Sequence, residues 1–433
     1  MQYSRLCLAA LAALALNACG GSGDPAPPPN NFRVAASDGI TTLTWDADPG
    51  VEYWVFSSTD ASLNTQNWLL LGEPRLFRPV TPPLVLCSLI NGKTNYYTVN
   101  GRTGGGPGGP GAPTTAGMPR AAGSAWAGGS GLSGNLLGVG YAPIFICGPA
   151  QAASGIFVAV GAAGVIFTSA DGRTWTARAA PAGFTSDLFA VAAFTASLNT
   201  PAAPNSRYVA VGAGGAALTS TDGINWTVGI AFNAANPAFR AVAVSGSTFV
   251  AVGDNGTVQT TTDGTSWTAR TSTTTANLTA VSCAIGRCIA LGAGGIIVTS
   301  DDNGGTWTQR AAIAGAPALK ALVFGNFNAN ADNTGLVNIA TWIAVGDGGV
   351  AARSFDNGVT WITQTIGGAG NLIGIGYTTR FVALDVTGNA FTSNTGESWS
   401  APIAIGSVNL RAMVGSGFGY VAAGDAGATS SSF

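Results

Sequence analysis

Three units of this 433-residue chain carry a basic and an acidic residue at matching positions, so these residues could form a polar binding site. The basic residues, each second in an apolar segment, are Arg240, Lys320 and Arg411. The acidic residues, each directly after the glycine of a V-A-V-G-like segment, are Asp254, Asp347 and Asp425. If the two segments are antiparallel neighbours, the charges meet at one end of a sheet. They form either surface ion pairs of little energetic weight or a charged rim that binds a polar ligand or an anionic segment of a partner.

Five further aspartates recur in turns of the form S-x-D-G-x-x-W or S-x-D-x-G-x-T-W, with threonine replacing the serine once. They are Asp171, Asp222, Asp263, Asp302 and Asp356, and the copy at Ser393 lacks the aspartate. We call all these turns the Asp turns. The carboxylate can accept hydrogen bonds from N–H groups of its own turn, the glycine can adopt a positive φ, and the tryptophan can fill the core. We therefore expect these aspartates to be structural, and we predict no catalytic residue.

The residue types that are missing exclude much chemistry. The chain has no histidine, which is the commonest general base and metal ligand, and only three glutamates, Glu52, Glu73 and Glu397. A sialidase-like glycoside hydrolase, the least favoured alternative, would need a tyrosine–glutamate pair and a further acid. We expect a protein that is not an enzyme and has no metal or cofactor. The balance of 18 basic and 20 acidic residues gives no reason to expect nucleic-acid binding.

Short strands, repeated about every forty residues, must position these groups. Residues 157–176, FVAVGAAGVIFTSADGRTWT, recur in altered form down the chain, and the shortened copy YVAAGDAGATSSSF comes last. An apolar opening segment precedes each copy, beginning at Leu136, Leu188, Phe239, Leu278, Leu319, Leu372 and Leu410. This pattern predicts an all-β fold with a seven-bladed β-propeller in residues 123–433. The last copy lacks its tryptophan strand, and Trp126 has the right spacing to supply it, so an N-terminal strand should close the ring.

The Asp turns resemble the Asp-box of the bacterial neuraminidase (BNR) repeat, which residues 300–307 and 354–361 match in full. Together with the G-x-[IV]-x-x-[ST]-x-D-G-x-x-W rhythm, they make residues 136–433 similar to the propellers of the photosystem II stability and assembly factor family. The resemblance implies the seven-bladed fold. It identifies no photosystem partner.

The N-terminal segment has the pattern of an export signal. In residues 1–18, Arg5 precedes an apolar run from Leu6 to Leu16. The run ends in Asn17-Ala18-Cys19-Gly20, which resembles a bacterial lipobox, and this resemblance implies a lipidated Cys19 as the membrane anchor. Glycine rather than aspartate after Cys19 favours the outer membrane. The alternative is an ordinary secretory signal with a chance cysteine.

Composition divides the rest of the N-terminal region. Residues 19–30 are a Pro/Gly-rich tether and residues 104–122 a Gly/Pro-rich linker. Between them, residues 31–103 show the alternation of a small all-β sandwich. Trp45 and residues 89–99, LINGKTNYYTV, resemble the core tryptophan and leucine–tyrosine corner of fibronectin type III domains. Such a domain is expected to be a spacer or a binding module.

Four cysteines remain beyond the signal and the anchor. An exported chain with an even number of cysteines predicts disulfides. Cys283 and Cys288 flank a short loop between two predicted antiparallel strands, so they are a possible pair. A bond between Cys87 and Cys147 would join the two domains.

Three long insertions, at residues 142–155, 195–207 and 326–340, should lie opposite the charged rim. They are either recognition loops or tolerated insertions. Our leading hypothesis is a lipid-anchored, non-enzymatic envelope protein whose propeller binds or helps assemble another protein. The alternative is a surface module that binds a glycan. Membrane contact is expected through the lipid anchor only.

Overall fold

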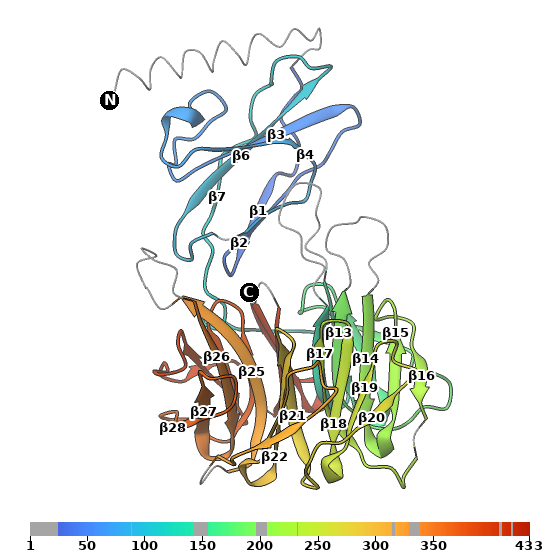
Figure 1. The fold of residues 1–433 in the computed structure, drawn as a ribbon. Coiled ribbons are helices and arrows are strands. Elements are labelled where there is room, and N and C mark those ends of the chain that lie inside the picture. Colours follow the sequence, from blue (N-terminus) through green and yellow to red (C-terminus); the bar gives the residue numbers. More distant parts are fainter. Residues whose placement is uncertain are drawn as a thin grey trace. The chain divides into compact units, whose positions relative to one another are not determined.

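The computed structural model describes residues 25–87, 89–142, 155–195, 206–231, 233–313, 317–328, 338–406, 409–416 and 419–433, without the side chains of residues 327, 328 and 338. The chain divides into two all-β units, of which the first ends at Ala121 and the second begins at Ala122 (Figure 1). The predicted signal, Cys19, Cys147 and most of the three insertions lie outside the described residues. In the described part of the chain, no helix is both long and apolar enough to cross a membrane.

The first unit is a sandwich of two antiparallel sheets. One sheet has the order β1 (Arg33–Ser37), β2 (Ile40–Thr44), β5 (Leu84–Leu86). The other has the order β4 (Arg75–Val80), β3 (Val51–Ser58), β6 (Asn95–Thr103), β7 (Thr115–Gly117), and a short 3-10 helix, η1 (Trp68–Leu70), lies between β3 and β4. Trp45 is buried between the sheets, packs edge-on against Tyr53 at 5.7 Å, and shares its core with Tyr97. The fibronectin type III resemblance itself stays a prediction.

The sandwich extends into both segments that composition assigned to spacers. Ala26, from the predicted tether, is buried, and β7 lies within the predicted linker and pairs with β6. Small residues allow this packing. A Cβ atom on Gly109, for example, would lie 1.8 Å from the carbonyl oxygen of Ala26. Glycine content therefore indicated close backbone packing here, rather than a free linker.

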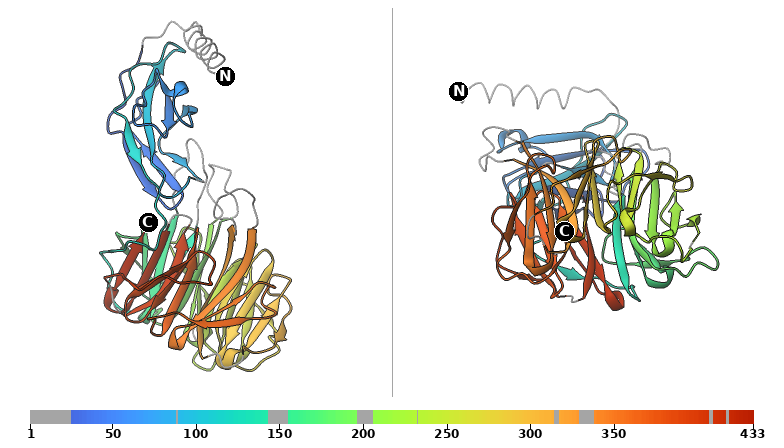
Figure 2. Two further views of the ribbon diagram at one scale, coloured as in Figure 1. Left: turned by 90° about the vertical axis from the view of Figure 1, so that its left-hand side faces the viewer. Right: turned by 60° about the horizontal axis from the view of Figure 1, so that its bottom comes forward.

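The second unit is a propeller of seven antiparallel four-stranded sheets, numbered here as blades 1 to 7 along the chain (Figures 1 and 2). From the innermost strand outward, blades 1 to 3 are β9 (Leu136–Ala142), β10 (Ile156–Gly161), β11 (Ile166–Ser169), β12 (Thr176–Arg178); β13 (Leu188–Thr195), β14 (Ser206–Gly212), β15 (Ala217–Ser220), β16 (Thr227–Ile230); and β17 (Phe239–Ser245), β18 (Thr248–Gly253), β19 (Val258–Thr261), β20 (Thr268–Arg270). Blades 4 and 5 are β21 (Leu278–Ala284), β22 (Arg287–Gly292), β23 (Ile297–Ser300), β24 (Thr308–Arg310); and β25 (Leu319–Asn328), β26 (Asn338–Gly346), β27 (Val350–Ser354), β28 (Ile362–Thr365). Blades 6 and 7 are β29 (Leu372–Tyr377), β30 (Phe381–Asp385), β31 (Asn389–Ser393), β32 (Ile403–Ala404); and β33 (Leu410–Ser416), β34 (Gly419–Gly424), β35 (Thr429–Ser432), β8 (Ala127–Gly128).

Apolar side chains of adjacent blades interlock to form the core. The second strands are buried on both faces, because each blade packs between two others, and this explains their continuous V-A-V runs. The tryptophans fill the spaces between blades. Trp226 of blade 2, for example, packs with Val158 of blade 1. The innermost strands contact one another around the whole ring, including β33 with β9.

Blade 7 is built from two distant parts of the chain. β8 pairs with β35, with Gly128 opposite Ser430. The N–H of Gly123 donates to Ser432 Oγ at 2.7 Å, and Trp126 Nε1 donates to Gly123 O at 3.1 Å. The continuous Asp turn of blade 2 has the same two bonds, from Gly223 to Ser220 and from Trp226 to Gly223. The last Asp turn is therefore assembled from two separate segments of the chain. With β8 in place every blade has four strands, and the neighbouring blades enclose each innermost strand.

Candidate functional site

A β-bulge recurs at the start of every innermost strand and shapes the candidate site. In blade 3, Phe239 pairs with Gly253 and Ala241 with Val252, so Arg240 between them has no partner in the ladder. A bulge turns its extra residue out of the regular alternation of side chains. The same register shift leaves one residue unpaired in each blade. These seven residues, which we call the bulge ring, are Leu137, Phe189, Arg240, Thr279, Lys320, Ile373 and Arg411.

The three basic members of the bulge ring pair with the aspartates that the sequence pattern matched to them. Arg240 binds Asp254 through two hydrogen bonds of 2.9 and 2.7 Å. In Arg411, Nη2 donates to Asp425 Oδ2 at 2.6 Å and Nε donates at 3.1 Å. The Lys320 ammonium group pairs with Asp347. Hydrogen bonds that the arginines donate to the aspartates raise the pKa of both arginines, so their guanidinium groups stay charged.

Exposure within each pair decides which charge faces outward. The side chains of Arg240, Lys320 and Arg411 are 43%, 38% and 56% exposed, whereas their partners Asp254, Asp347 and Asp425 are 22%, 33% and 26% exposed. Each carboxylate lies deeper than its cation. The three pairs are neutral in sum, but they present positive charge to solvent on alternate blades.

Apolar side chains share this rim with the cations. The guanidinium carbon of Arg240 lies 5.1 Å from the centre of the Phe189 ring in blade 2, which is cation–π range. Leu137, Phe189 and Ile373 are half-buried. The ring thus combines half-exposed apolar surface with outward cations, as protein-binding surfaces commonly do.

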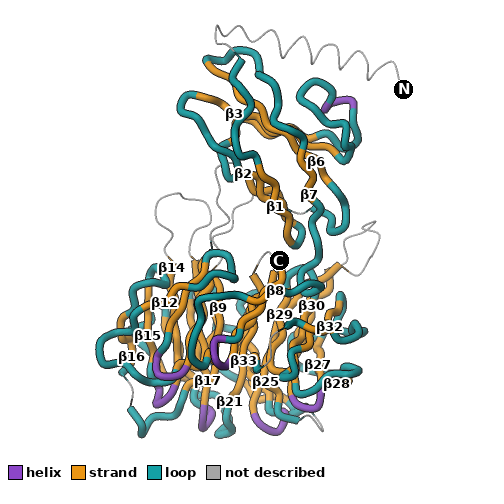
Figure 3. Tube along the Cα trace, turned by 180° about the vertical axis from the view of Figure 1, so that it is seen from behind, coloured by secondary structure: helices purple, strands orange, loops and turns teal. Residues whose placement is uncertain are grey.

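Tight turns hold the aspartates of the three pairs. Six blades have a 3-10 turn between their second and third strands, and these turns gather at one end of the propeller (Figure 3). They are η2 (Ala162–Gly164), η3 (Ala213–Gly215), η4 (Asp254–Gly256), η5 (Ala293–Gly295), η6 (Asp347–Gly349) and η7 (Asp425–Gly427). In blade 6, the buried Asp385 side chain replaces this turn and accepts the N–H groups of Thr387 and Asn389 at 2.9 and 3.0 Å.

The Asp turns connect third and fourth strands, so they lie at the opposite end of the blades. Asp222 Oδ1 accepts from Ser220 Oγ and from the N–H groups of Ile224 and Asn225, and Oδ2 accepts from Asn225 Nδ2, all within 2.7–2.9 Å. The other four likewise accept bonds within their own turns: Asp171, Asp263, Asp302 and Asp356. These carboxylates are occupied as turn caps.

Hydrogen bonding also sets the ionisation of the Asp turns. Burial acts to raise the pKa of Asp222, but bonds from Asn225, Ile224 and Ser220 outweigh it and lower the pKa to about 2. Bonds from the N–H groups of Ser266 and Thr265 lower the pKa of Asp263 further. A carboxyl group with so low a pKa is a poor general acid at neutral pH.

The glutamate and tyrosine side chains that a sialidase-like enzyme would need are ion-paired or buried. Glu397, the one glutamate of the propeller, lies 2.8 Å from the guanidinium of Arg353. Burial, with a smaller effect from Asp222, raises the pKa of Tyr208 to about 12, and burial raises the pKa of Tyr141 as well. Neither phenol ionises readily as a nucleophile. Across the described ranges, no group of three His, Cys, Asp or Glu residues could hold a metal ion.

The structure describes both cysteines of one predicted pair but only Cys87 of the other. Cys283 and Cys288 are opposite each other in the β21–β22 ladder and form a disulfide. Between them, Ile285 is 87% exposed and has φ 52°, followed by Gly286 with φ 79°. Cys87 is also disulfide-bonded, and Cys147 lies outside the described residues, so a bond between these two cysteines stays a prediction.

Sequence reasoning missed the four uncharged members of the bulge ring. It singled out the second residue of three opening segments because the residue there was charged. Thr279, Leu137, Phe189 and Ile373 occupy the same position, but they gave no signal because uncharged residues are ordinary in an apolar strand. Aligning all seven openings by that position would have found them.

Comparison with known proteins supports the fold. No protein-family model matches the chain, and neither does any curated protein. Several solved structures do match the chain. One titled "YCF48 bound to D1 peptide" matches with a TM-score of 0.52 and 14% identity over 71% of this chain and 96% of that chain. "YCF48 from Cyanidioschyzon merolae" matches with a TM-score of 0.50 and 17% identity over 71% and 98%. The WD40 β-propeller domain of Doa1 matches with a TM-score of 0.50 and 10% identity over 71% and 95%. At these identities, the likeness shows that the chain contains a β-propeller similar to that of YCF48, a photosystem II assembly factor.

Proposed function

We propose that this chain is a non-enzymatic scaffold whose propeller binds a segment of another protein at the bulge ring. The observation that carries the proposal is the exposure of the ring's ion pairs. Arg240, Lys320 and Arg411 face solvent while their carboxylate partners lie deeper. A cation whose charge is only partly screened from outside can bind a second anion or a carbonyl group.

The apolar members of the ring define the rest of the partner segment. The ring contains both cations and apolar side chains, the latter being Leu137, Phe189 and Ile373. The bound segment should therefore carry acidic groups or a free carboxylate together with apolar side chains. Binding would bury the half-exposed apolar surface of the ring and make charged contacts beside it. The structure titled "YCF48 bound to D1 peptide" is a precedent for peptide binding by a protein of the same fold.

The proposal places the protein in the cell envelope. Its support is the sequence alone, in which the export signal and the lipobox-like Cys19 precede the folded units. A lipid anchor on the outer membrane would concentrate the propeller near envelope proteins. Metabolic labelling with a radioactive fatty acid, comparing wild type with Cys19→Ala, tests this part separately. If the variant still incorporates the label, the proposed lipid anchor at Cys19 is contradicted.

Affinity co-purification from mild-detergent envelopes tests the scaffold. Wild type should retain a stoichiometric protein partner that the triple variant Arg240→Gln/Lys320→Gln/Arg411→Gln loses. Glutamine keeps much of each side chain's length and polarity, so the change is mainly one of charge.

A matched control removes three positive charges elsewhere on the propeller. Arg173→Gln/Arg178→Gln/Arg310→Gln alters side chains that hydrogen-bond to serine or threonine hydroxyls rather than to aspartates. This control should keep the partner. If both triple variants lose it equally, general charge and not the bulge ring carries the binding. If wild type retains no protein partner, the scaffold function is refuted.

A further inference from the structure

The loop that joins blade 3 to blade 4 differs from the loops that follow blades 4, 5 and 6. After the outer strands of blades 4, 5 and 6, an isoleucine fills the space beneath the loop, and these buried residues are Ile313, Ile366 and Ile405. Ile366 is the fifth residue from the start of β28 and precedes the next inner strand by six. At the same spacing from β20 and β21, blade 3 has Ser272. Serine in place of isoleucine removes most of the apolar volume that fills the loops after blades 4, 5 and 6.

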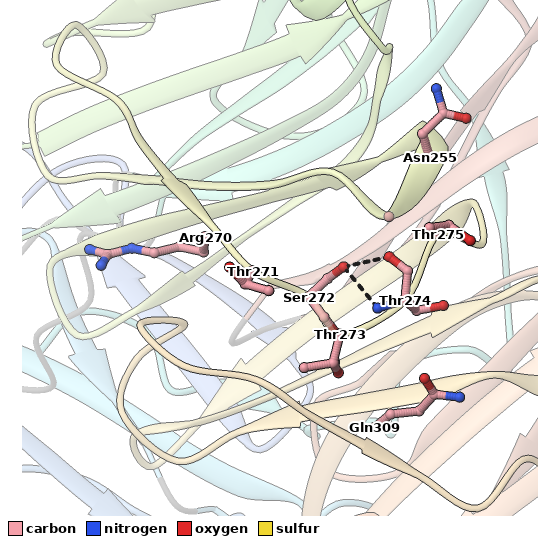
Figure 4. Close-up of a pocket in the computed structure, with 9 residues that line it drawn as sticks. Asn255, Arg270, Thr271, Ser272, Thr273, Thr274, Thr275 and Gln309 are labelled. Carbon is pink, nitrogen blue, oxygen red and sulfur yellow. Dashed lines mark hydrogen bonds between the residues drawn. The ribbon is translucent and has the colours of Figure 1, made fainter.

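A pocket of about 630 Å³ opens where that isoleucine is missing. It is lined by residues 270–275, by Asn255 and Gly256 of η4, and by Gln309 of β24 (Figure 4). Ser272 is itself buried, and its Oγ donates to Thr274 O at 2.9 Å. This volume lies within the range of small-molecule pockets in proteins.

The loop gives up stability to keep this shape. Thr273 has φ 64°, in the left-handed region where a β-branched residue is rare and strained. In blade 6, Gly406 follows the buried isoleucine with φ 75°, and glycine takes that conformation freely. Blade 3 therefore has two hydroxyl residues where blade 6 has an isoleucine and a glycine. Neither replacement improves packing or backbone geometry.

The groups that face the pocket are uncharged and can both donate and accept hydrogen bonds. The side chains of Asn255, Gln309, Thr271 and Thr275 have no hydrogen-bond partner among the residues that the structure describes. Arg270 extends away from the other labelled side chains, and its Nε donates to Thr260 Oγ1 at 3.0 Å (Figure 4). An apolar ligand would leave these polar groups unsatisfied, and an anion would find no free cation aimed at it.

We propose that this pocket binds a neutral saccharide residue. Each sugar hydroxyl donates and accepts, as do the amide and hydroxyl groups of the lining. The threonines add methyl groups, which suit the C–H edges of a sugar ring. A peptide is less suitable, because this polar lining, as the structure describes it, presents no free sheet edge, apolar side-chain pocket or inward-facing cation. This inference is independent of the proposed scaffold function, and the bulge-ring triple variant should bind the sugar as wild type does.

Saturation-transfer NMR and calorimetry on the full chain test the proposal. The probes are glucose, galactose, mannose and N-acetylglucosamine, with glucuronate as the anionic comparator. We expect at least one neutral sugar to bind to wild type. Ser272→Ile, which introduces the isoleucine found in the loops after blades 4, 5 and 6, should weaken that binding about tenfold or more without lowering the Tm.

Two further variants keep the test decisive. Ile366→Ser makes the reverse change in blade 5 and should leave sugar affinity unchanged. If Ser272→Ile fails to fold, Gln309→Ala, at an exposed strand position, should weaken the same binding. The proposal is overturned if no neutral sugar binds, if only glucuronate binds, or if closing the pocket leaves affinity unchanged.

Discussion

The structure predicts that Asp222 stabilises the propeller through its charge, by an amount that depends on pH. Asp222→Asn keeps the size of the side chain and one oxygen acceptor but removes the negative charge. In the folded protein this carboxyl accepts four hydrogen bonds of 2.7–2.9 Å from its own turn. The variant replaces an ionised acceptor by a neutral one at every remaining bond, and bonds to ionised groups are stronger.

The shifted pKa of Asp222 gives the size of the effect. The pKa falls from the ordinary 3.8 to about 2, and about 1.36 kcal/mol per pKa unit makes this about 2 kcal/mol of stability. The carboxyl is partly exposed, so solvent screens its charge. We therefore expect Asp222 to contribute about 1–2 kcal/mol to the free energy of unfolding. The folded pKa is lower than the unfolded one, so this stabilisation is complete well above pH 3.8 and is lost as the pH falls toward 2. About half should remain at about pH 3.

Urea unfolding followed by tryptophan fluorescence measures this effect. The free energy of unfolding of Asp222→Asn is subtracted from that of wild type at pH 6 and again at pH 3, so that the titration of other groups cancels. The difference should shrink by about half at the lower pH. An equal difference at both pH values would show that the charge of Asp222 does not cap the turn, and the structural account of the Asp turns would be wrong.

The chain contains a reciprocal control in blade 6. There, Thr395 stands at the aspartate position of an otherwise matching short turn. Within the described residues, its Oγ1 accepts a single hydrogen bond, from the N–H of Glu397 at 3.2 Å. Thr395→Asp should raise the free energy of unfolding by about 1 kcal/mol at pH 6 and by less at pH 3. The two variants should therefore show opposite signs and the same direction of pH dependence.

Three other predictions concern stability. Ile285→Asn should stabilise the protein by ~0.5–1 kcal/mol, because asparagine followed by glycine suits two consecutive positive-φ residues in a hairpin; a lower Tm would contradict this. The double variant Cys283→Ala/Cys288→Ala should lose about 2 kcal/mol in urea unfolding, as expected for so short a closed loop, and reductant should have no further effect at this site. Trp126→Ala should lose about 2 kcal/mol because it leaves a gap beside Tyr420 in blade 7, and hydrogen exchange should rise first in β35 and β8.

Local patterns were enough to predict the architecture. The V-A-V-G runs, the Asp turns and the regular tryptophans repeat the same short-range physics in each unit, because strand burial and turn geometry depend on neighbours within a few residues. They led to an all-β chain with a seven-bladed propeller, a fold that the comparisons support. The same spacing argument matched Arg240 with Asp254 and its two counterparts, since two adjacent antiparallel strands meet at a fixed register.

Features that depend on distant segments were out of reach of such patterns. The bulge ring takes one residue from each of seven blades, and only closure of the ring brings them to one rim. The glycine-rich linker was assigned to free chain because composition does not show that its backbone packs on β6. The pocket beside Ser272 lies where the loops after blades 4, 5 and 6 hold a buried isoleucine, and Gln309 of the neighbouring blade contributes to its lining. Contacts between residues far apart in the chain determine these features, and no single stretch of sequence contains them.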